Sequence, residues 1–84
     1  MSRKQPRWSA PLSRPITVKD GPTLGTLGDA RDFMLHQPEK IQLRQSWQRA
    51  AGLLLAAADG ADVDSVTKQI ELALFLEARW AFQK

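Results

Sequence analysis

The chain has 84 residues, contains no cysteine and carries a formal net charge of +3 at neutral pH. Its length allows one domain with a small core, and the lack of cysteine excludes disulfide bonds and Cys-based metal sites and is typical of a reducing cytoplasm. The longest apolar run, residues 50–58, is shorter than the roughly 18–20 residues that span a bilayer. We therefore expect a small, soluble, cytoplasmic protein that does not enter a membrane.

The positive charge is concentrated at the N-terminus. Residues 1–15 hold no acid and four bases, which are Arg3, Lys4, Arg7 and Arg14. The same stretch contains three prolines and follows neither the period of a strand nor that of a helix. We predict a flexible basic tail over residues 1–14, followed by a single domain over residues 15–84.

One aromatic residue, Trp8, lies within this basic tail. Arg3, Lys4 and Arg7 could neutralise backbone phosphates while Trp8 stacks on a base, which makes these four residues a candidate nucleic-acid site. The alternative is that Trp8 folds back onto the apolar surface of the last helix while the bases keep a small protein soluble. The sequence leaves both possibilities open.

A short β-hairpin is predicted after the tail. Ile16 and Val18 alternate with polar residues, which is the pattern of a half-buried strand. Asp20 and Gly21 then form a strong hairpin signal, because glycine accepts the positive φ of a tight turn. The return strand is expected over residues 23–26, and since two strands alone are marginal in water, the hairpin must pack against helices.

The first helix is expected over residues 29–37, ending before Pro38. Thr26 and Asp29 have the spacing of a capping box at its start. His36 follows Asp32 by four positions, so the two are expected to form a surface pair rather than a general base or a metal site.

Two longer helices are predicted in the remainder of the chain, over residues 38–59 and 62–82. Gly60 is expected to end the first of them in a left-handed conformation, and Asp62 or Asp64 to cap the second. Because the connection is short, the two helices should form an antiparallel hairpin. The predicted fold class is therefore α+β, with a short N-terminal β-hairpin packed on three helices.

The last helix is apolar on two sides. One arc faces the core, and its members are Val63, Val66, Ile70, Ala73, Leu74, Trp80 and Ala81. Leu72, Phe75 and Phe82 fall on the opposite arc. Glu77 lies within the core-facing arc, where an unpaired carboxylate would be costly. We predict that Arg44 or Lys40 from the preceding helix reaches it.

The layout resembles a family of small alphaproteobacterial proteins that carry a domain of unknown function. The resemblance rests on the stretches GDARDF (residues 28–33) and ELALFLEA (residues 71–78) and covers about residues 14–82. It implies a compact α+β domain in a bacterial cytoplasmic protein and transfers no active-site residue.

No motif for catalysis, for a cofactor or for a metal is recognised, because the glycines lack the spacing of a phosphate loop and no acids pair in apolar surroundings. We expect a non-enzymatic interaction or regulatory domain that binds a protein partner or a second copy. The expected contact residues are Leu72, Phe75, Trp80 and Phe82. One alternative is a nucleic-acid accessory protein acting through the tail; another is that the hairpin, the first helix or the tail covers these apolar residues.

Overall fold

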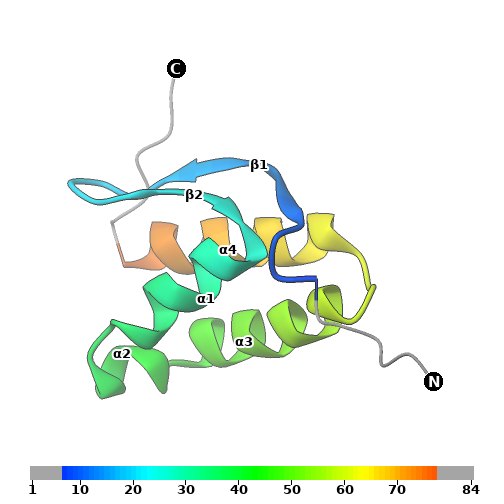
Figure 1. The fold of residues 1–84 in the computed structure, drawn as a ribbon. Helices are drawn as coiled ribbons and strands as arrows, with labels where there is room; N and C mark the ends of the chain where they lie inside the picture. Colours follow the sequence, from blue (N-terminus) through cyan, green and yellow to red (C-terminus); the bar gives the residue numbers. More distant parts are fainter. Residues whose placement is uncertain (1–6, 78–84) are drawn as a thin grey trace.

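The computed structural model describes residues 7–77. In this range two strands precede four helices (Figure 1): β1 (Pro11–Thr17), β2 (Thr23–Thr26), α1 (Leu27–Leu35), α2 (Glu39–Gln42), α3 (Gln45–Ala58) and α4 (Val63–Leu76). The predicted α+β class is confirmed, as is the antiparallel pairing of the last two helices. Trp80, Ala81 and Phe82 lie outside the described residues.

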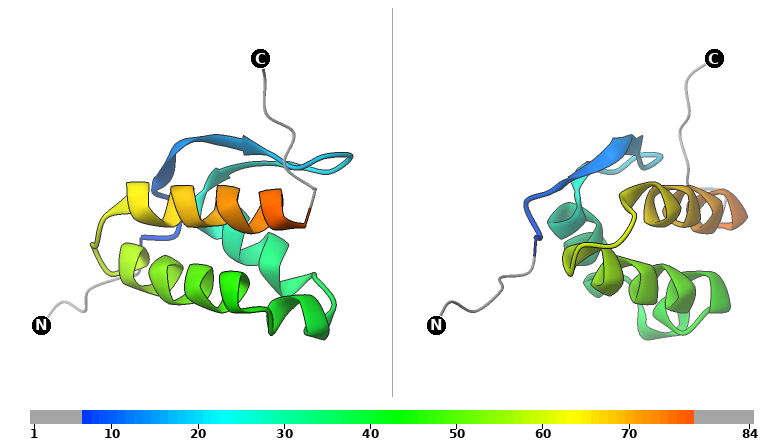
Figure 2. Two further views of the ribbon diagram at one scale, coloured as in Figure 1. Left: turned by 180° about the vertical axis from the view of Figure 1, so that it is seen from behind. Right: turned by 90° about the vertical axis from the view of Figure 1, so that its right-hand side faces the viewer.

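The elements stack in three layers (Figures 1 and 2). The hairpin forms one outer layer, α1 and α4 lie beneath it, and α3 forms the opposite outer layer. Strand β1 packs on α4, and β2 packs on α1, which follows it without a loop. Helix α3 packs on both α1 and α4 and closes the core from below.

The hairpin has the predicted antiparallel pairing, with Ile16 opposite Leu24. The amide of Gly21 donates to the carbonyl of Val18 at 3.0 Å and closes the turn. The positive φ of this turn, 56°, belongs to Asp20. The expectation that Gly21 supplies it was wrong; aspartate is one of the few other residues that tolerate this conformation.

The predicted domain boundary between residues 14 and 15 was wrong, because it falls inside β1. Leu12 is buried in the core, and the chain is already fixed before β1, where the Arg7 amide donates to the carbonyl of Ala58 at 2.7 Å. Residues 7–14 are therefore part of the domain. The stretch around them is rich in proline and shows no helical or strand period, so residues 7–14 were assigned to the tail. Their order comes from contacts with distant segments of the chain, which a local pattern does not reveal.

Side chains from two helices occupy backbone donors of the sheet. The Ser13 amide in β1 donates to Thr67 Oγ1 at 3.1 Å, and the Gly25 amide in β2 donates to Asp29 Oδ2 at 2.9 Å. Asp29 also completes the capping box, since Thr26 Oγ1 accepts from its amide and its carboxylate accepts from the amide of Thr26. Both strands thus have amides that are already satisfied by helix side chains.

The helix predicted over residues 38–59 is two helices. Arg44 has an extended conformation, with φ −64° and ψ 142°, and separates α2 from α3. Glutamine side chains from both sides of this break satisfy carbonyls that precede it: Gln42 Nε2 donates to the Gln37 carbonyl and Gln48 Nε2 to the Gln42 carbonyl, each at 2.8 Å. The break turns Leu43 into solvent, where it is 64% exposed.

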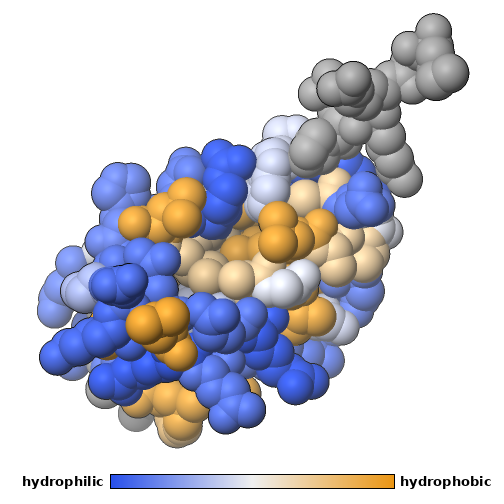
Figure 3. All heavy atoms as spheres, turned by 90° about the horizontal axis from the view of Figure 1, so that it is seen from below, coloured by the Kyte–Doolittle hydropathy of each residue, from blue (hydrophilic) through white to orange (hydrophobic). Residues whose placement is uncertain are grey.

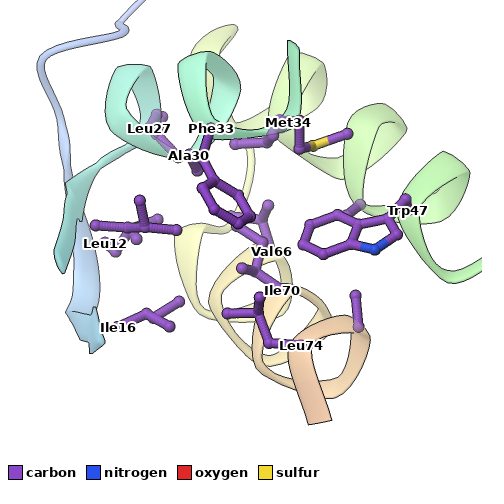
Figure 4. Close-up of a cluster of buried hydrophobic side chains, with 14 of the residues drawn as sticks. Leu12, Ile16, Leu27, Ala30, Phe33, Met34, Trp47, Val66, Ile70 and Leu74 are labelled. Atoms are coloured by element: carbon purple, nitrogen blue, oxygen red, sulfur yellow. The ribbon is translucent and has the colours of Figure 1, made fainter. Parts of the chain in front are cut away.

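The core lies where α1, α3, α4 and the hairpin meet (Figure 4). Trp47 is almost completely buried, and its ring centroid lies 6.1 Å from that of Phe33. The predicted core face of α4 is confirmed for Val66, Ile70, Ala73 and Leu74. Two polar residues of the same helix are also buried, Thr67 and Glu71.

The turn between α3 and α4 has the predicted design. Gly60 has a φ of 111° just after α3, and the Asp62 carboxylate accepts hydrogen bonds from the amides of Asp64 and Ser65 at the start of α4. Helix α4 then runs antiparallel to α3 as far as Leu76, with Glu77 as its C-cap.

Candidate protein-binding surfaces

The outer face of α4 carries an exposed apolar cluster. Leu72, Phe75 and Leu76 are 46%, 57% and 60% exposed, respectively. Their spacing of three and four positions places them together on the side of the helix opposite its buried arc. We call these three residues the α4 patch. The hairpin and α1 do not cover it, so the alternative in which they bury Leu72 and Phe75 was wrong for these two residues.

Three charged groups near the α4 patch are paired with one another. Lys68 Nζ lies 3.1 Å from Asp64 Oδ2, one turn away on the same helix. Arg14 Nη1 lies 3.9 Å from Asp64 Oδ1 and approaches the same carboxylate from β1. The Lys68 hydrogen bond is the main reason that the pKa of Asp64 is lower than usual. The patch is therefore an apolar surface with paired charges near Lys68, whereas Arg49 of α3 lines a depression together with Leu72 and Leu76.

A second apolar surface lies between α1 and α3. It is a groove of about 270 Å³, which we call the α1–α3 groove. Its lining residues are Trp8, Arg31, Met34, Leu35, Gln42, Gln48, Ala51, Leu54 and Leu55. The face of the molecule seen from below (Figure 3) has apolar side chains gathered toward its middle and hydrophilic ones around them. Leu35 and Leu55 are each 64% exposed.

Trp8 forms one end of this groove and is held there by the backbone. Its carbonyl accepts from the Gly28 amide at 2.8 Å, and a Cβ at Gly28 would lie only 3.1 Å from that oxygen. The position therefore favours glycine. The guanidinium carbon of Arg31 lies 4.5 Å from the centroid of the Trp8 ring, in cation–π geometry. Trp8 is thus anchored to the domain rather than carried on a tail.

The predicted nucleic-acid residues are only partly described. Arg7 is exposed and directly precedes Trp8, whereas Arg3 and Lys4 lie outside the described residues. Arg31 occupies one face of the Trp8 ring, so only the other side of the indole could take a base. This contact does not favour the stacking role expected for Trp8.

Sequence reasoning missed the groove. A signal was present, because Leu35 and Leu55 lie off the apolar stripe that buries their own helices. The sequence pattern of a single helix does not reveal that exposed leucines from two different helices line the same groove.

The predicted ion pair at the end of α4 is confirmed. Arg44 Nη1 lies 2.8 Å from Glu77 Oε2, and the Glu77 side chain is only 11% exposed. Both residues line a depression of about 620 Å³ between the start of α3 and the end of α4. Because Arg44 compensates the carboxylate, Glu77 has a structural partner, and the depression offers no second acid beside it.

His36 contacts the backbone rather than a carboxylate. Its Nδ1 atom lies 2.7 Å from the Asp32 carbonyl oxygen, while the Asp32 carboxylate pairs with Arg31 at 3.2 Å. The predicted Asp32–His36 side-chain pair was therefore wrong, because the adjacent arginine is the stronger partner. Among residues 7–77, no three His, Cys, Asp or Glu side chains are grouped as they would be to hold a metal ion.

Comparison with known proteins adds no relative. No protein-family model, curated protein or solved structure matches this chain significantly. The resemblance to the alphaproteobacterial family therefore stays a prediction. Within the described part of the chain, no helix is both long and apolar enough to cross a membrane.

Proposed function

We propose that this chain is a non-catalytic interaction domain that acts in the cytoplasm and self-associates through the α4 patch. The observation that carries the proposal is the exposure of Leu72, Phe75 and Leu76 as one contiguous apolar surface on a helix whose other side is fixed in the core. Exposed apolar clusters of this kind are typical of interfaces. The absence of cysteine from the sequence fits a reducing compartment.

A second copy suits this surface because the surface is complementary to itself. In a two-fold dimer the same patch meets its own image, so any uncompensated charge would face a like charge. Asp64 and Lys68 beside the α4 patch are paired within the helix, and Arg49 lies on its α3 side, where it lines a depression with Leu72 and Leu76. Two copies can bring Leu72, Phe75 and Leu76 together with the Asp64–Lys68 pair adding no like-charge repulsion.

The association is expected to be weak. Full burial of one large apolar side chain contributes about 1.5–3 kcal/mol, and these three are already about half buried. The cost of losing translational and rotational freedom offsets much of that gain. We expect a dissociation constant in the low micromolar range, roughly 1–10 µM.

Sedimentation equilibrium over a range of protein concentrations tests the proposal. The wild-type mass should rise from monomer to dimer, and Phe75→Asp should stay monomeric because a carboxylate would be buried in the interface. Leu43→Asp is the matched control, since Leu43 is 64% exposed but lies between α2 and α3. Both variants should keep the wild-type circular dichroism spectrum.

Two outcomes would refute self-association through this helix. One is a wild-type protein that stays monomeric at several hundred micromolar, on the order of a hundred times the expected dissociation constant. The other is a dimer that Phe75→Asp and Leu43→Asp weaken equally.

A further inference from the structure

We propose that the α1–α3 groove binds an amphipathic helix of another protein whose acidic residues meet the Trp8 end of the groove. This site is separate from the α4 patch, and it does not depend on self-association. Its lining residues and those of the α4 patch have no member in common.

The dimensions of the groove suit side chains of a docked helix. On the α3 side it extends from Gln48 to Leu55, which is two helical turns or about 10.5 Å. Its volume of about 270 Å³ is below the roughly 300–1,000 Å³ of small-molecule pockets. A helix with apolar residues at i, i+3, i+4 and i+7 presents a stripe of matching length.

The lining is apolar along its length and polar at its two ends. Met34, Leu35 and Leu55 form much of the wall, and the amide side chains of Gln42 and Gln48 lie toward the start of α3. Arg31 and Trp8 lie toward the end of α3, because the residue before Trp8 is bonded to the carbonyl of Ala58. A docked helix can therefore bury its stripe while its flanks meet polar groups.

Charge indicates the chemistry of the partner. Arg31 is the charged residue in the lining, and no carboxylate belongs to it. Arg7 is exposed directly before Trp8. The neighbouring Asp32 pairs with Arg31, and the two side chains are 61% and 41% exposed, respectively. An acidic group at the end of the docked helix would therefore add a second partner for the Arg31 guanidinium, which has five donors.

The groove is largely preformed. Trp8 is held in place because its carbonyl accepts from the Gly28 amide and the preceding Arg7 amide donates to the Ala58 carbonyl. Leu54 at the floor is buried in the core. Preformed walls lower the ordering cost of binding. Large exposed aliphatic side chains at its rim, Leu35 and Leu55, are then available to contact the partner.

Two dye-labelled helical peptides test the proposal by fluorescence anisotropy. Both carry leucines at i, i+3, i+4 and i+7; one has glutamates flanking the stripe and the other has lysines at the same positions. The glutamate peptide should bind wild-type protein more tightly than the lysine peptide. Leu55→Asp should weaken that binding at least about tenfold, because truncating a central contact typically has an effect of this size.

Matched variants separate this site from the rest of the surface. Leu43→Asp, with the same exposure as Leu55 but outside the groove, should change the affinity by less than about twofold. Arg31→Glu should reverse the preference between the two peptides. Phe75→Asp should bind the glutamate peptide as well as wild type does, so a failure of self-association leaves this test intact.

Three results would overturn the proposal. The first is that neither peptide binds wild-type protein at several hundred micromolar, far above the micromolar range of ordinary helix docking. The second is that Leu55→Asp and Leu43→Asp have equal effects. The third is that a labelled single-stranded oligonucleotide binds with strong salt dependence and displaces the glutamate peptide, which would assign the Trp8–Arg31 end to nucleic acid.

Discussion

Arg14 in β1 and Glu71 in α4 are 57 positions apart in the sequence and form a bidentate pair. Arg14 Nε donates to Glu71 Oε2 at 2.8 Å, and Nη2 donates to Oε1. The Glu71 side chain is only 9% exposed, whereas that of Arg14 is 49% exposed. The hydrogen bonds that Arg14 donates to Glu71 raise the pKa of Arg14 above its ordinary value. This pair joins the first strand to the last helix.

Arg14→Ala should destabilise the protein, because the Glu71 carboxylate would stay buried without its base. Arg14→Ala combined with Glu71→Leu should recover part or all of the lost stability, since the double variant no longer buries a charge. The free energy of unfolding from urea titrations measures both effects. Lys68→Ala, which removes an exposed ion pair, is the control and should have little effect. A double variant less stable than Arg14→Ala would contradict this account.

Acid should destabilise the start of α4. The Ser65 hydroxyl and then the Asp64 amide hold the pKa of Asp62 below its ordinary value, and the Lys68 hydrogen bond does the same for Asp64. A carboxyl group whose pKa is lower in the folded state than in the unfolded state stabilises the fold at pH values above its unfolded pKa, which is about 4. This stabilisation is lost as the pH falls through the folded pKa. The free energy of unfolding should therefore decrease below about pH 4.

Ser65→Ala separates this effect from that of other acids. It removes the hydroxyl hydrogen bond to Asp62, so it should be less stable than wild type near pH 7. The difference should shrink as the pH falls through the folded pKa of Asp62, because the carboxyl group is then protonated in the folded state as well as in the unfolded state. A difference between the two proteins that is constant from pH 7 to about pH 2 would rule out Asp62 as the titrating group.

Two glycines near the end of α3 should respond to alanine in opposite directions. Gly52 lies within the helix, and an added Cβ there would meet no atom of the described chain beyond its own helix within 4 Å. Gly52→Ala should therefore stabilise the protein by about 0.5–1 kcal/mol. Gly60 has a φ of 111°, so Gly60→Ala should destabilise it by about 1–3 kcal/mol. Thermal unfolding followed by circular dichroism measures both changes; the same sign for both variants would argue against this turn geometry.

Adjacent leucines of α3 provide a test of the packing. Leu54 is 3% exposed and Leu55 is 64% exposed. Leu54→Ala leaves a cavity in the core and should lower the free energy of unfolding by about 2–5 kcal/mol. Leu55→Ala should change it by about 0.5 kcal/mol or less. Urea titration measures the free energy of unfolding of both variants. If Leu55→Ala lowered it as much as or more than Leu54→Ala, the orientation of α3 would be wrong.

Features that depend on neighbouring residues were predictable from the sequence. The Thr26 capping box, the Gly60 turn and the Asp62 cap each need only three or four residues in the right order. The Arg44–Glu77 pair was also predictable, because an antiparallel helical hairpin fixes which residues are opposite when they are counted from its turn.

Features that depend on distant segments were not predictable. Arg14 and Glu71 each looked like an ordinary surface residue, because neither helical nor strand periodicity shows that β1 crosses α4. The break at Arg44 has no glycine or proline to mark it, and the glutamines that satisfy its carbonyls are common on helix surfaces. Trp8 was assigned to a tail for the same reason, and a deletion of residues 1–14 would remove part of β1 along with it.

The helix side chains that occupy β-sheet amides have a consequence for how copies of this protein can associate. An open strand edge is a template on which other chains, including misfolded copies, can add strands and form aggregates. Here Thr67 binds an amide of β1 and Asp29 binds amides of β2. Growth by strand addition would have to break these bonds first. The fold therefore directs encounters with other molecules toward its helical surfaces and away from the route that leads to fibrils.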